Sequence, residues 1–448
     1  MIVPAQFLTR SLRHSPYGPV ITRILAAGLN AVHPGEAVRR FVQREKNKLR
    51  IANLLYPLEK DLRTFIIAFG KASLPMADSL AEILRDRLTG GVVIPKHAAG
   101  WTSGRLAVME GGHPVPDERS LAAGRRVIEL ISGLREEDLV FCLISGGGSA
   151  LMAAPVGGVT LSDLQALTSS LLACGASIED INILRRHLDL LKGGGLARLA
   201  FPARVVSLIL SDVVGNPLEA IASGPTAPDP TTCADALAVL EKYKLPKKIP
   251  ESVITALRSG YETIKPGDAV FENVDNLLVG SNLIAAQAAL KQADIESFHP
   301  YLLRTDLQGE ARQVAVELCR TLRWAWQTGN PAPRPACIIA GGETTVTLVG
   351  NGRGGRNTEL ALASVTELAD FPEVMLLSLA TDGEDGPTDA AGAVVNGETL
   401  GRAFAMGLDP VDYLRRNDSY TFFAALDDLL KPGPTVTNVH DLIYLFTF

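Results

Sequence analysis

Three β-rich apolar runs of this chain end abruptly in glycine, serine and acidic residues, the residue types that bind phosphate groups and metal ions. The three loops begin at Ser145, Ser211 and Thr381. Glycine-rich backbone can approach a phosphate closely, and carboxylate oxygens bind divalent cations. Open α/β sheets bind their ligands just beyond the carboxyl ends of their strands. The pattern therefore predicts an enzyme that handles a phosphorylated ligand together with a divalent cation.

The loop over residues 145–149, Ser-Gly-Gly-Gly-Ser, is the strongest candidate for phosphate binding. Three adjacent glycines permit positive φ and let successive backbone N–H groups form an anion-binding concavity. The alternative is a tight turn of small residues, although one turn does not require three glycines. Lys71 lies at a second junction between a strand and a helix, where its charge can reach a phosphate. A solvated loop lysine is the alternative there.

Acidic residues follow two of the apolar runs. Asp212 at a strand end is a candidate metal ligand or base, and an Asx turn is the alternative. Asp382 begins a loop that also contains Glu384, Asp385 and Asp389, with a spacing unlike that of an EF-hand. Because the loop directly follows a buried strand, we favour a metal site or an active site over a solvated acidic loop.

Residues 350–355 satisfy the G-x-G-x-x-G pattern between an expected strand at 344–349 and an expected helix. That context is the one that a dinucleotide site requires. Arg353 and Arg356 favour a clamp on a phosphate or a carboxylate instead. The segment is not a Walker loop, since no Lys-Ser/Thr pair follows Gly355. Both a phosphate-handling and an NAD(P)-dependent enzyme therefore remain open from these residues.

Two further residues could contact a substrate. His113 follows Gly111-Gly112 at a strand end, where it could bind a substrate carboxylate or form a turn with the backbone. Lys192 precedes three glycines and adds to a local positive charge suited to an anion. The alternative for those glycines is a helix C-cap.

Alternating strand and helix patterns must position these residues. Buried strands are expected at 64–69, 141–144, 205–210 and 375–380, separated by helices. Strands alternating with helices predict βαβ units and a mostly parallel sheet. A helix is also expected over 35–53, and Ser162 is the expected N-cap of a helix over 162–174.

The 448 residues exceed what one hydrophobic core supports. A change of character between residues 225 and 275, where proline and lysine accumulate, predicts α/β domains over 1–245 and 275–448. In this prediction, the C-terminal segment can also pack against the first domain.

Composition and charge argue against a nucleic-acid partner and against a membrane-spanning segment. The net charge is −6 and no run of Lys or Arg stands out, which argues against a nucleic-acid partner. No apolar stretch is long enough to span a bilayer. The five cysteines are scattered, with no C-x-x-C pair and no zinc-ligand spacing, as expected for reduced thiols of a cytoplasmic protein.

The ordered set of motifs resembles the glycerate 2-kinase family, whose second domain is called the MOFRL domain. The set covers nearly the whole chain and is specific as a set, although no single motif is. The chain departs from the family pattern at Val436, where glycine is frequent, and at His440, where asparagine is usual. The motifs that carry the resemblance are Phe-Gly-Lys-Ala at 69–72, Gly-Gly-His-Pro-Val-Pro-Asp at 111–117, Ser-Gly-Gly-Gly-Ser-Ala at 145–150, Ser-Asp-Val-Val-Gly-Asn at 211–216, Ala-Ser-Gly-Pro-Thr at 222–226, Gly-Gly-Glu-Thr-Thr at 341–345, Gly-Gly-Arg-Asn at 354–357, Ala-Thr-Asp-Gly-Glu-Asp-Gly at 380–386 and the segment 433–442.

The resemblance implies ATP-dependent phosphorylation of D-glycerate at its 2-hydroxyl, which gives 2-phosphoglycerate and ADP. It also implies a larger Rossmann-like α/β/α sandwich with a mostly parallel sheet, a second α/β domain, and an active-site cleft between them. Family members have been labelled hydroxypyruvate reductases, so NAD(P)-dependent reduction is the rival activity. A non-catalytic nucleotide or sugar-acid sensor is the second rival. The choice of the 2-hydroxyl rests on the resemblance alone.

The resulting hypothesis is in-line transfer of the γ-phosphoryl group of ATP to glycerate, assisted by Mg²⁺, in a monomer or homodimer. Lys71 would neutralise charge, and Asp212 or Asp382 would hold the metal or accept the hydroxyl proton. The predicted site residues are Lys71, Asp212 and Arg356 for catalysis, Ser145, Gly146, Gly147, Gly148, Ser149, Glu343 and Arg353 for the nucleotide, Asp212 and Asp382 for the metal, and His113, Lys192 and Asp389 for the substrate.

Overall fold

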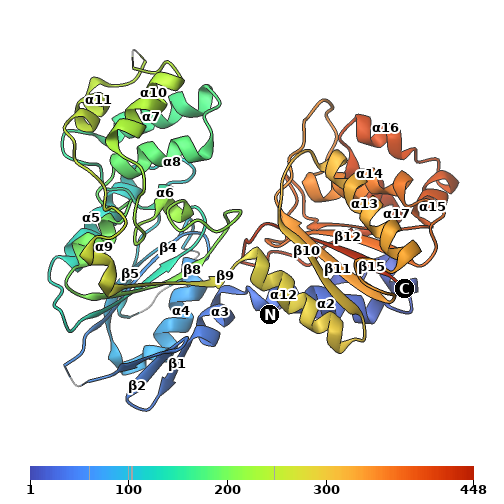
Figure 1. Cartoon of the computed structure of the whole chain (residues 1–448), viewed down its shortest axis with the longest axis horizontal. Coiled ribbons are helices and arrows are strands. Elements are labelled where there is room, and N and C mark those ends of the chain that lie inside the picture. Colours follow the sequence, from blue (N-terminus) through green and yellow to red (C-terminus); the bar gives the residue numbers. More distant parts are fainter. Residues whose placement is uncertain (60, 99, 102–103, 247) are drawn as a thin grey trace. The chain divides into compact units, whose positions relative to one another are not determined.

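Two six-stranded sheets lie in separate units of the described chain (Figure 1). One unit is Pro34–Val279, and the other combines Met1–His33 with Gly280–Phe448. The computed structural model describes residues 1–59, 61–98, 100–101, 104–246 and 248–448.

This division differs from the predicted domains over 1–245 and 275–448, because the N-terminal segment packs with the C-terminal half of the chain. Helix α2 (Gly18–Ala31) lies against α12 (Asn282–Ile295), and a Cβ on Gly28 would lie 2.9 Å from the Tyr444 hydroxyl. The C-terminal segment, for which packing against the first domain is the predicted alternative, belongs to the unit that contains Gly280–Phe448.

The sheet of the first unit has the strand order β6-β5-β4-β7-β8-β9, and the pairs from β6 to β8 are parallel. Every residue of β4 and β7 is buried, as expected for parallel strands whose two faces are both covered. The predicted mostly parallel sheet is confirmed. The strands are β4 (Thr64–Phe69), β5 (Leu88–Ile94), β6 (Leu106–Val108), β7 (Leu139–Ile144), β8 (Arg204–Leu210) and β9 (Val274–Gly280).

Helices cover this sheet and extend beyond it (Figure 1). Helix α7 begins with a capping box in which Thr160 and Asp163 bond each other's backbone N–H groups. Thr160, and not the predicted Ser162, is therefore the N-cap. The helices of this unit include α3 (Pro34–Phe41), α4 (Ser73–Leu84), α5 (Glu118–Ile131), α6 (Gly148–Leu151), α7 (Leu161–Ala173), α8 (Ile178–His187), α9 (Gly195–Ala200), α10 (Cys233–Lys242) and α11 (Glu251–Arg258).

The helix expected over 35–53 is wrong beyond Phe41, where the chain turns into a small antiparallel sheet of β1 (Val42–Glu45), β2 (Lys48–Ile51) and β3 (Leu54–Pro57). In β2, exposed and buried residues alternate, with only Leu49 and Ile51 buried. This period of two is that of a strand with one covered face, and it overrides the helical spacing upstream.

The sheet of the second unit has the order β10-β11-β15-β12-β13-β14. The last strand, β15, lies between β11 and β12 and runs antiparallel to both. Sequence patterns missed β10, β13 and β15, and residues 344–349 contain only an isolated bridge from Thr345 to Glu310 instead of the expected strand. The strands are β10 (His299–Leu307), β11 (Ala336–Gly342), β12 (Val374–Ala380), β13 (Gly392–Asn396), β14 (Leu429–Leu430) and β15 (Asp441–Thr447).

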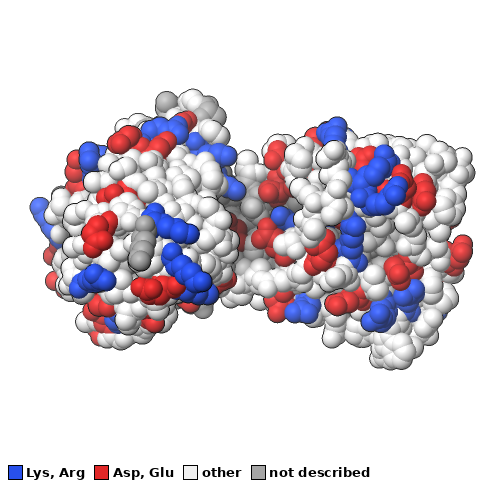
Figure 2. Space-filling model, turned by 90° about the horizontal axis from the view of Figure 1, so that it is seen from above, with Lys and Arg blue, Asp and Glu red and all other residues white. Residues whose placement is uncertain are grey.

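Buried aliphatic and aromatic side chains of α13, α14, β12 and β15 form the core of the second unit. Its helices include α1 (Arg10–His14), α2, α12, α13 (Ala311–Thr328), α14 (Arg356–Glu367), α15 (Thr399–Ala405), α16 (Pro410–Arg415) and α17 (Ser419–Leu426). On the face in Figure 2, Lys and Arg side chains are interspersed with Asp and Glu over each unit. Among the described residues, no helix combines the length and the apolar character that crossing a bilayer demands.

Candidate active site

Three loops meet because the strands that precede them end in register. Phe69 of β4 pairs with Ile144 of β7, and Ile144 pairs with Ile209 of β8. The Ser145 N–H donates to the carbonyl of Phe69 at 3.1 Å, and the Lys71 N–H donates to the carbonyl of Gly146 at 2.9 Å. The predicted phosphate loop and the predicted lysine loop are therefore bonded to each other through their backbones.

The glycines of this loop allow close approach of functional side chains. A Cβ on Gly146 would lie 1.9 Å from Asp212 Oδ2, so only glycine leaves room for that carboxylate. Gly147 adopts a φ of +80°, and a Cβ there would lie 3.1 Å from His113 Nε2 and 3.6 Å from Lys71 Cγ. Asp212, His113 and Lys71, predicted from three separate motifs, thus surround one loop.

Positive charge dominates the surroundings of His113. Burial lowers the pKa of the His113 imidazole, and the charges of Lys71, Lys96 and Arg185 lower it further. Among the described residues, no carboxylate pairs with the side chain of Lys71 or Arg185. A neutral imidazole beside cations without counter-ions is a suitable environment for an anionic ligand.

Arg185 and Ser149 line one cavity of this unit, whose walls are mostly apolar residues of α7 and α8. The Ser149 hydroxyl lies 2.8 Å from the Ser223 hydroxyl. Burial lowers the pKa of the Arg185 guanidinium, as expected for a charge withdrawn from water without a partner. We call Lys71, His113, Arg185, Asp212 and residues 145–149 the glycine-loop site.

Lys192 lines the same cavity but is engaged within the fold. Its ammonium donates to Asp189 Oδ2 at 2.6 Å and to the carbonyl of Met152 at 3.0 Å. Asp189 in turn accepts the N–H groups of Ala154 and Leu191. A role of Lys192 in substrate binding stays a prediction, beside this evident role in holding the α8–α9 connection.

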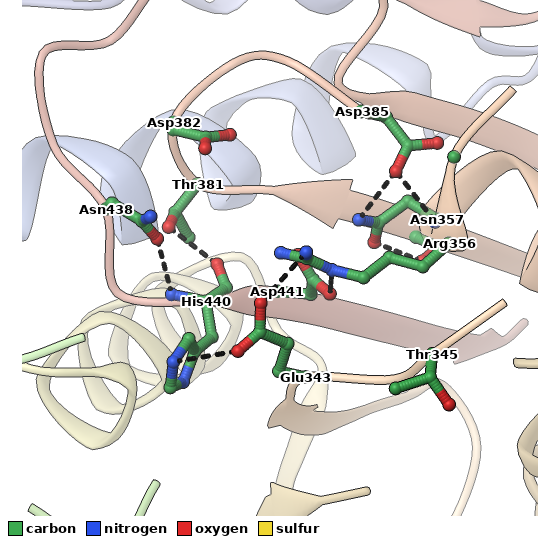
Figure 3. A network of polar contacts seen from close by, with 12 residues as sticks. Glu343, Thr345, Arg356, Asn357, Thr381, Asp382, Asp385, Asn438, His440 and Asp441 are labelled. Carbon is green, nitrogen blue, oxygen red and sulfur yellow. Dashed lines mark hydrogen bonds and ion pairs between the residues drawn. The ribbon is translucent and has the colours of Figure 1, made fainter. Parts of the chain in front are cut away.

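A second polar cluster lies in the other unit (Figure 3). Arg356 Nε and Nη2 donate to the two carboxylate oxygens of Asp441 at 2.5 and 2.9 Å, and Arg356 Nη1 lies 2.9 Å from Glu343 Oε1. His440 Nε2 lies 3.3 Å from Glu343 Oε2. Burial lowers the pKa of Arg356, but the bonds to Asp441 and the charges of Asp441 and Glu343 outweigh it, so the pKa is raised. We call these four residues the Arg356 network.

Strand β15 assembles this network. Its first residue, Asp441, pairs with Gly342 at the end of β11 and with Ala380 at the end of β12. The two departures from the family pattern lie just before it: Val436 has a φ of 57° and His440 a φ of 67°. Glycine and asparagine adopt this left-handed region most readily, which explains their frequency at these positions.

The acidic loop after β12 divides into residues with different environments. The buried carboxylate of Asp385 accepts the backbone N–H groups of Asn357 and Thr358, so it caps the N-terminus of α14. The carbonyl of Asp382 accepts the N–H of Thr435, and one of its carboxylate oxygens accepts the N–H of Glu384. Of the two, only Asp382 remains a candidate metal ligand.

Arg353 and Asp389 share a partner on the surface. The Arg353 guanidinium stacks on the Tyr420 ring at 4.5 Å, and the Tyr420 hydroxyl donates to Asp389 Oδ1 at 2.7 Å. Lys431 also pairs with Asp389, at 3.1 Å. This exposed group brings two predicted residues together, although their contacts are with Tyr420 and not with the Arg356 network.

Comparison with known proteins decides the family. Residues 20–258 match the model of a domain of unknown function, DUF4147, and residues 336–441 match that of the MOFRL family. The chain is 44% identical over 384 residues to the D-glycerate 2-kinase of Thermotoga maritima, covering 85% of this chain and 90% of the relative. The chain belongs to the glycerate 2-kinase family.

A solved structure and a differently named relative complete the comparison. The crystal structure of a Thermotoga maritima glycerate kinase superposes with a TM-score of 0.86 at 41% identity, covering 95% of this chain and 98% of that one. A protein of Agrobacterium vitis, provisionally named a hydroxypyruvate reductase, is 41% identical over 88% of this chain and 89% of its own length. The two-domain α/β class predicted for this glycerate 2-kinase family member is confirmed.

The G-x-G-x-x-G segment does not have the context of a dinucleotide site. Residues 350–355 precede α14 as predicted, but they do not follow a strand. A Cβ on Gly350 would lie 2.3 Å from the carbonyl of Arg416, and one on Gly352 would lie 2.4 Å from the Asp418 Cβ. These glycines thus serve close packing against the connection between α16 and α17.

Sequence reasoning assigned no role to Arg185 or Asp441, which the structure places among the predicted residues. In the sequence, Arg185 only adds to the local positive charge near Lys192, because partial burial without a counter-ion has no signature in the sequence. Asp441 lies in the terminal motif that the resemblance includes, yet its partner Arg356 is 85 residues away. Only the pairing of β15 brings them together.

Proposed function

We propose that this chain is a D-glycerate 2-kinase that transfers the γ-phosphoryl group of ATP to the 2-hydroxyl of D-glycerate. Membership of the family supports the reaction. The observation that carries it in this chain is the glycine-loop site, where backbone N–H groups, a carboxylate and two cations without a carboxylate partner among the described residues surround one loop. We further propose that the enzyme works in the cytoplasm, where its five free cysteines stay reduced.

Asp212 fits the role of a magnesium ligand. Its carboxylate lies against Gly146, in a position that a side chain on residue 146 would fill. Carboxylate oxygens beside a phosphate loop are the donor set that Mg²⁺ uses in phosphoryl-transfer sites. When bound there, the ion would neutralise charge on the phosphate oxygens. Asp382 of the second unit stays a predicted metal ligand of its own loop.

Lys71 and residues 145–149 would hold the phosphates. The lysine side chain runs beside Gly147, so its charge and the loop N–H groups can act on the same anion. This stabilisation is the main protein contribution to phosphoryl transfer, because the reaction needs positioning and charge neutralisation more than covalent assistance. Asp212 is also the proposed acceptor of the hydroxyl proton in the alternative where it does not hold the metal.

Arg185 and His113 would bind glycerate. Arg185 is a half-buried cation without a carboxylate partner among the described residues, and a planar guanidinium suits the carboxylate of a small hydroxy acid. The neutral His113 can accept or donate a hydrogen bond to a hydroxyl. Arg356 would orient a ligand with the two of its five N–H groups that Asp441 and Glu343 leave unused.

Phosphorus NMR of the products formed from ATP, Mg²⁺ and D-glycerate tests the proposal. We expect the signals of 2-phosphoglycerate and ADP to appear together. A 3-phosphoglycerate signal would correct the position of transfer, and no turnover would contradict the kinase. NADH oxidation with hydroxypyruvate, followed in parallel, would instead support the reductase.

A further inference from the structure

Three side chains that commonly bind transition metals meet outside the residues proposed for catalysis. They are His187 at the end of α8, Cys233 at the start of α10, and Glu262 after α11. Their ligand atoms all lie within 4.8 Å of one another, and His187 Nε2 is 3.5 Å from Glu262 Oε2. Nitrogen, sulfur and oxygen donors at such distances match the ligand set of zinc.

The imidazole of His187 is oriented as a metal ligand would be. Its Nδ1 lies 2.9 Å from the carbonyl of Ile183, and because a carbonyl only accepts, Nδ1 carries the proton. Asp229 Oδ2, 3.8 Å from Nδ1, favours the same tautomer. Nε2 therefore presents its lone pair, and it is buried without a hydrogen bond among the described residues. Such an atom costs free energy unless a partner satisfies it.

Cys233 and Glu262 face the same point and are held there. The backbone N–H of Cys233 donates to Glu262 Oε1 at 2.9 Å, and Cys233 Sγ lies 3.4 Å from the carbonyl of Tyr261. Lys265 pairs with Glu262 Oε2 at 2.8 Å and is the one cation of the described residues that competes for this carboxylate. The Glu262 side chain is 40% exposed, which gives an ion a path from solvent to two buried ligands.

We propose that His187, Cys233 and Glu262 bind Zn²⁺ with a water molecule as fourth ligand. A thiolate and an imidazole select zinc over Mg²⁺, which prefers oxygen ligands, so this site is distinct in chemistry from the proposed magnesium ligands. The ion would join α8, α10 and the segment after α11, which lie far apart in the sequence. Zinc would thus stabilise the helical part of this unit.

Cobalt titration of the metal-free full-length protein tests the site without using activity. Co²⁺ bound to a thiolate gives a charge-transfer absorption in the near ultraviolet, and we expect it to saturate at one equivalent and to disappear when Zn²⁺ is added. Cys233→Ser should abolish the absorption and weaken Zn²⁺ binding about 100-fold or more, beyond what loss of an outer partner costs. Cys174→Ser changes the exposed cysteine and should leave both unchanged.

Two measurements keep the outcome interpretable if a variant is unstable. In EDTA, Cys233→Ser should melt near the wild type, because serine can still donate to the Tyr261 carbonyl. Glu262→Gln keeps an acceptor for the Cys233 N–H and should still weaken Zn²⁺ binding about tenfold or more. The proposal is overturned if no sulfur absorption appears, or if Cys233→Ser binds Zn²⁺ as tightly as Cys174→Ser.

Discussion

The glycine-loop site and the Arg356 network differ in how their cations are paired. In the described chain Lys71 and Arg185 have no carboxylate partner, whereas Arg356 is bonded to Asp441 and lies within reach of Glu343. Arg185 is half-buried, and a partly desolvated charge without a counter-ion is costly unless a ligand supplies one, whereas the exposed Lys71 can reach an anion from solvent. The difference supports the proposal that the first site receives an anion. In the second site, Asp441 and Glu343 already neutralise the charge of Arg356 and orient its side chain.

The two sites also differ in their backbones. Parallel strands β4, β7 and β8 end together and present consecutive loops at one edge of their sheet. In the other unit, an antiparallel strand starts where two others end, so that Asp441 lies between Gly342 and Ala380. Loss of the Lys71 charge in the first site should therefore affect catalysis alone, and loss of the Asp441 charge in the second should affect stability as well.

The largest expected effect is that of Lys71→Ala. Removing one charge that stabilises a transferring phosphoryl group should lower kcat by about 10²–10³-fold. The melting temperature should stay unchanged, because no described residue pairs with the Lys71 side chain. A coupled assay of ADP release measures the effect, with Lys48→Ala, an exposed lysine of the same unit, as the matched control. Near-normal turnover would remove Lys71 from the mechanism.

Gly146→Ala should be the next most damaging change. The added Cβ would lie 1.9 Å from Asp212 Oδ2 and must displace either the carboxylate or the loop, with an expected loss of about 10²-fold in kcat/KM because misplacement of a catalytic group by about 1 Å costs that much. Gly157→Ala is the control, since a Cβ there meets nothing within 4 Å. Equal kinetics of the two variants would show that the approach of Asp212 to the loop is not needed.

Asp441→Asn tests the other side of the comparison. The Asp441 side chain is buried, and Arg356 would lose the charge that two of its N–H groups contact. We expect the free energy of unfolding to fall by about 1–3 kcal/mol, together with a loss of activity. Urea titration measures the first and the ADP assay the second. Unchanged stability with lost activity would give Asp441 the kind of role that is proposed for Lys71, and the two sites would then no longer differ in this respect.

The smallest effect concerns the pH dependence of stability. The pKa of His113 is lowered in the folded protein by burial and by the neighbouring cations, so the unfolded chain takes up the proton first as the pH falls. Stability present above the ordinary histidine pKa of about 6.5 is therefore lost as the pH falls toward the folded pKa. His113→Gln should flatten this part of a urea-unfolding series between about pH 7 and 5. If the free energy of unfolding fell more steeply with falling pH in the variant, the pKa of His113 would be raised and not lowered by folding.

Local patterns predicted the parts of the site that depend on neighbouring residues. The apolar runs of β4, β7 and β8 and the glycines that follow them are contiguous, and the structure brings Lys71, Asp212 and His113 to that loop as expected. The error in the helix expected over 35–53 is also local, because the alternation of exposed and buried residues in β2 has the period of a strand and not of a helix. The predicted roles of Arg353, Asp389 and Lys192 stay predictions, beside the contacts that the structure gives them.

The sequence by itself determined the family, the α/β class and the glycine, lysine and aspartate motifs, because each is a matter of residue type and short spacing. Only the tertiary structure decided that the first 33 residues belong with the C-terminal half, that β15 inserts between β11 and β12, and that Arg185 has no carboxylate partner among the described residues. Strand pairing and burial join residues that are hundreds of positions apart or that lie in unrelated motifs. The free energy of such contacts depends on which surfaces are removed from water together, and no local pattern records that.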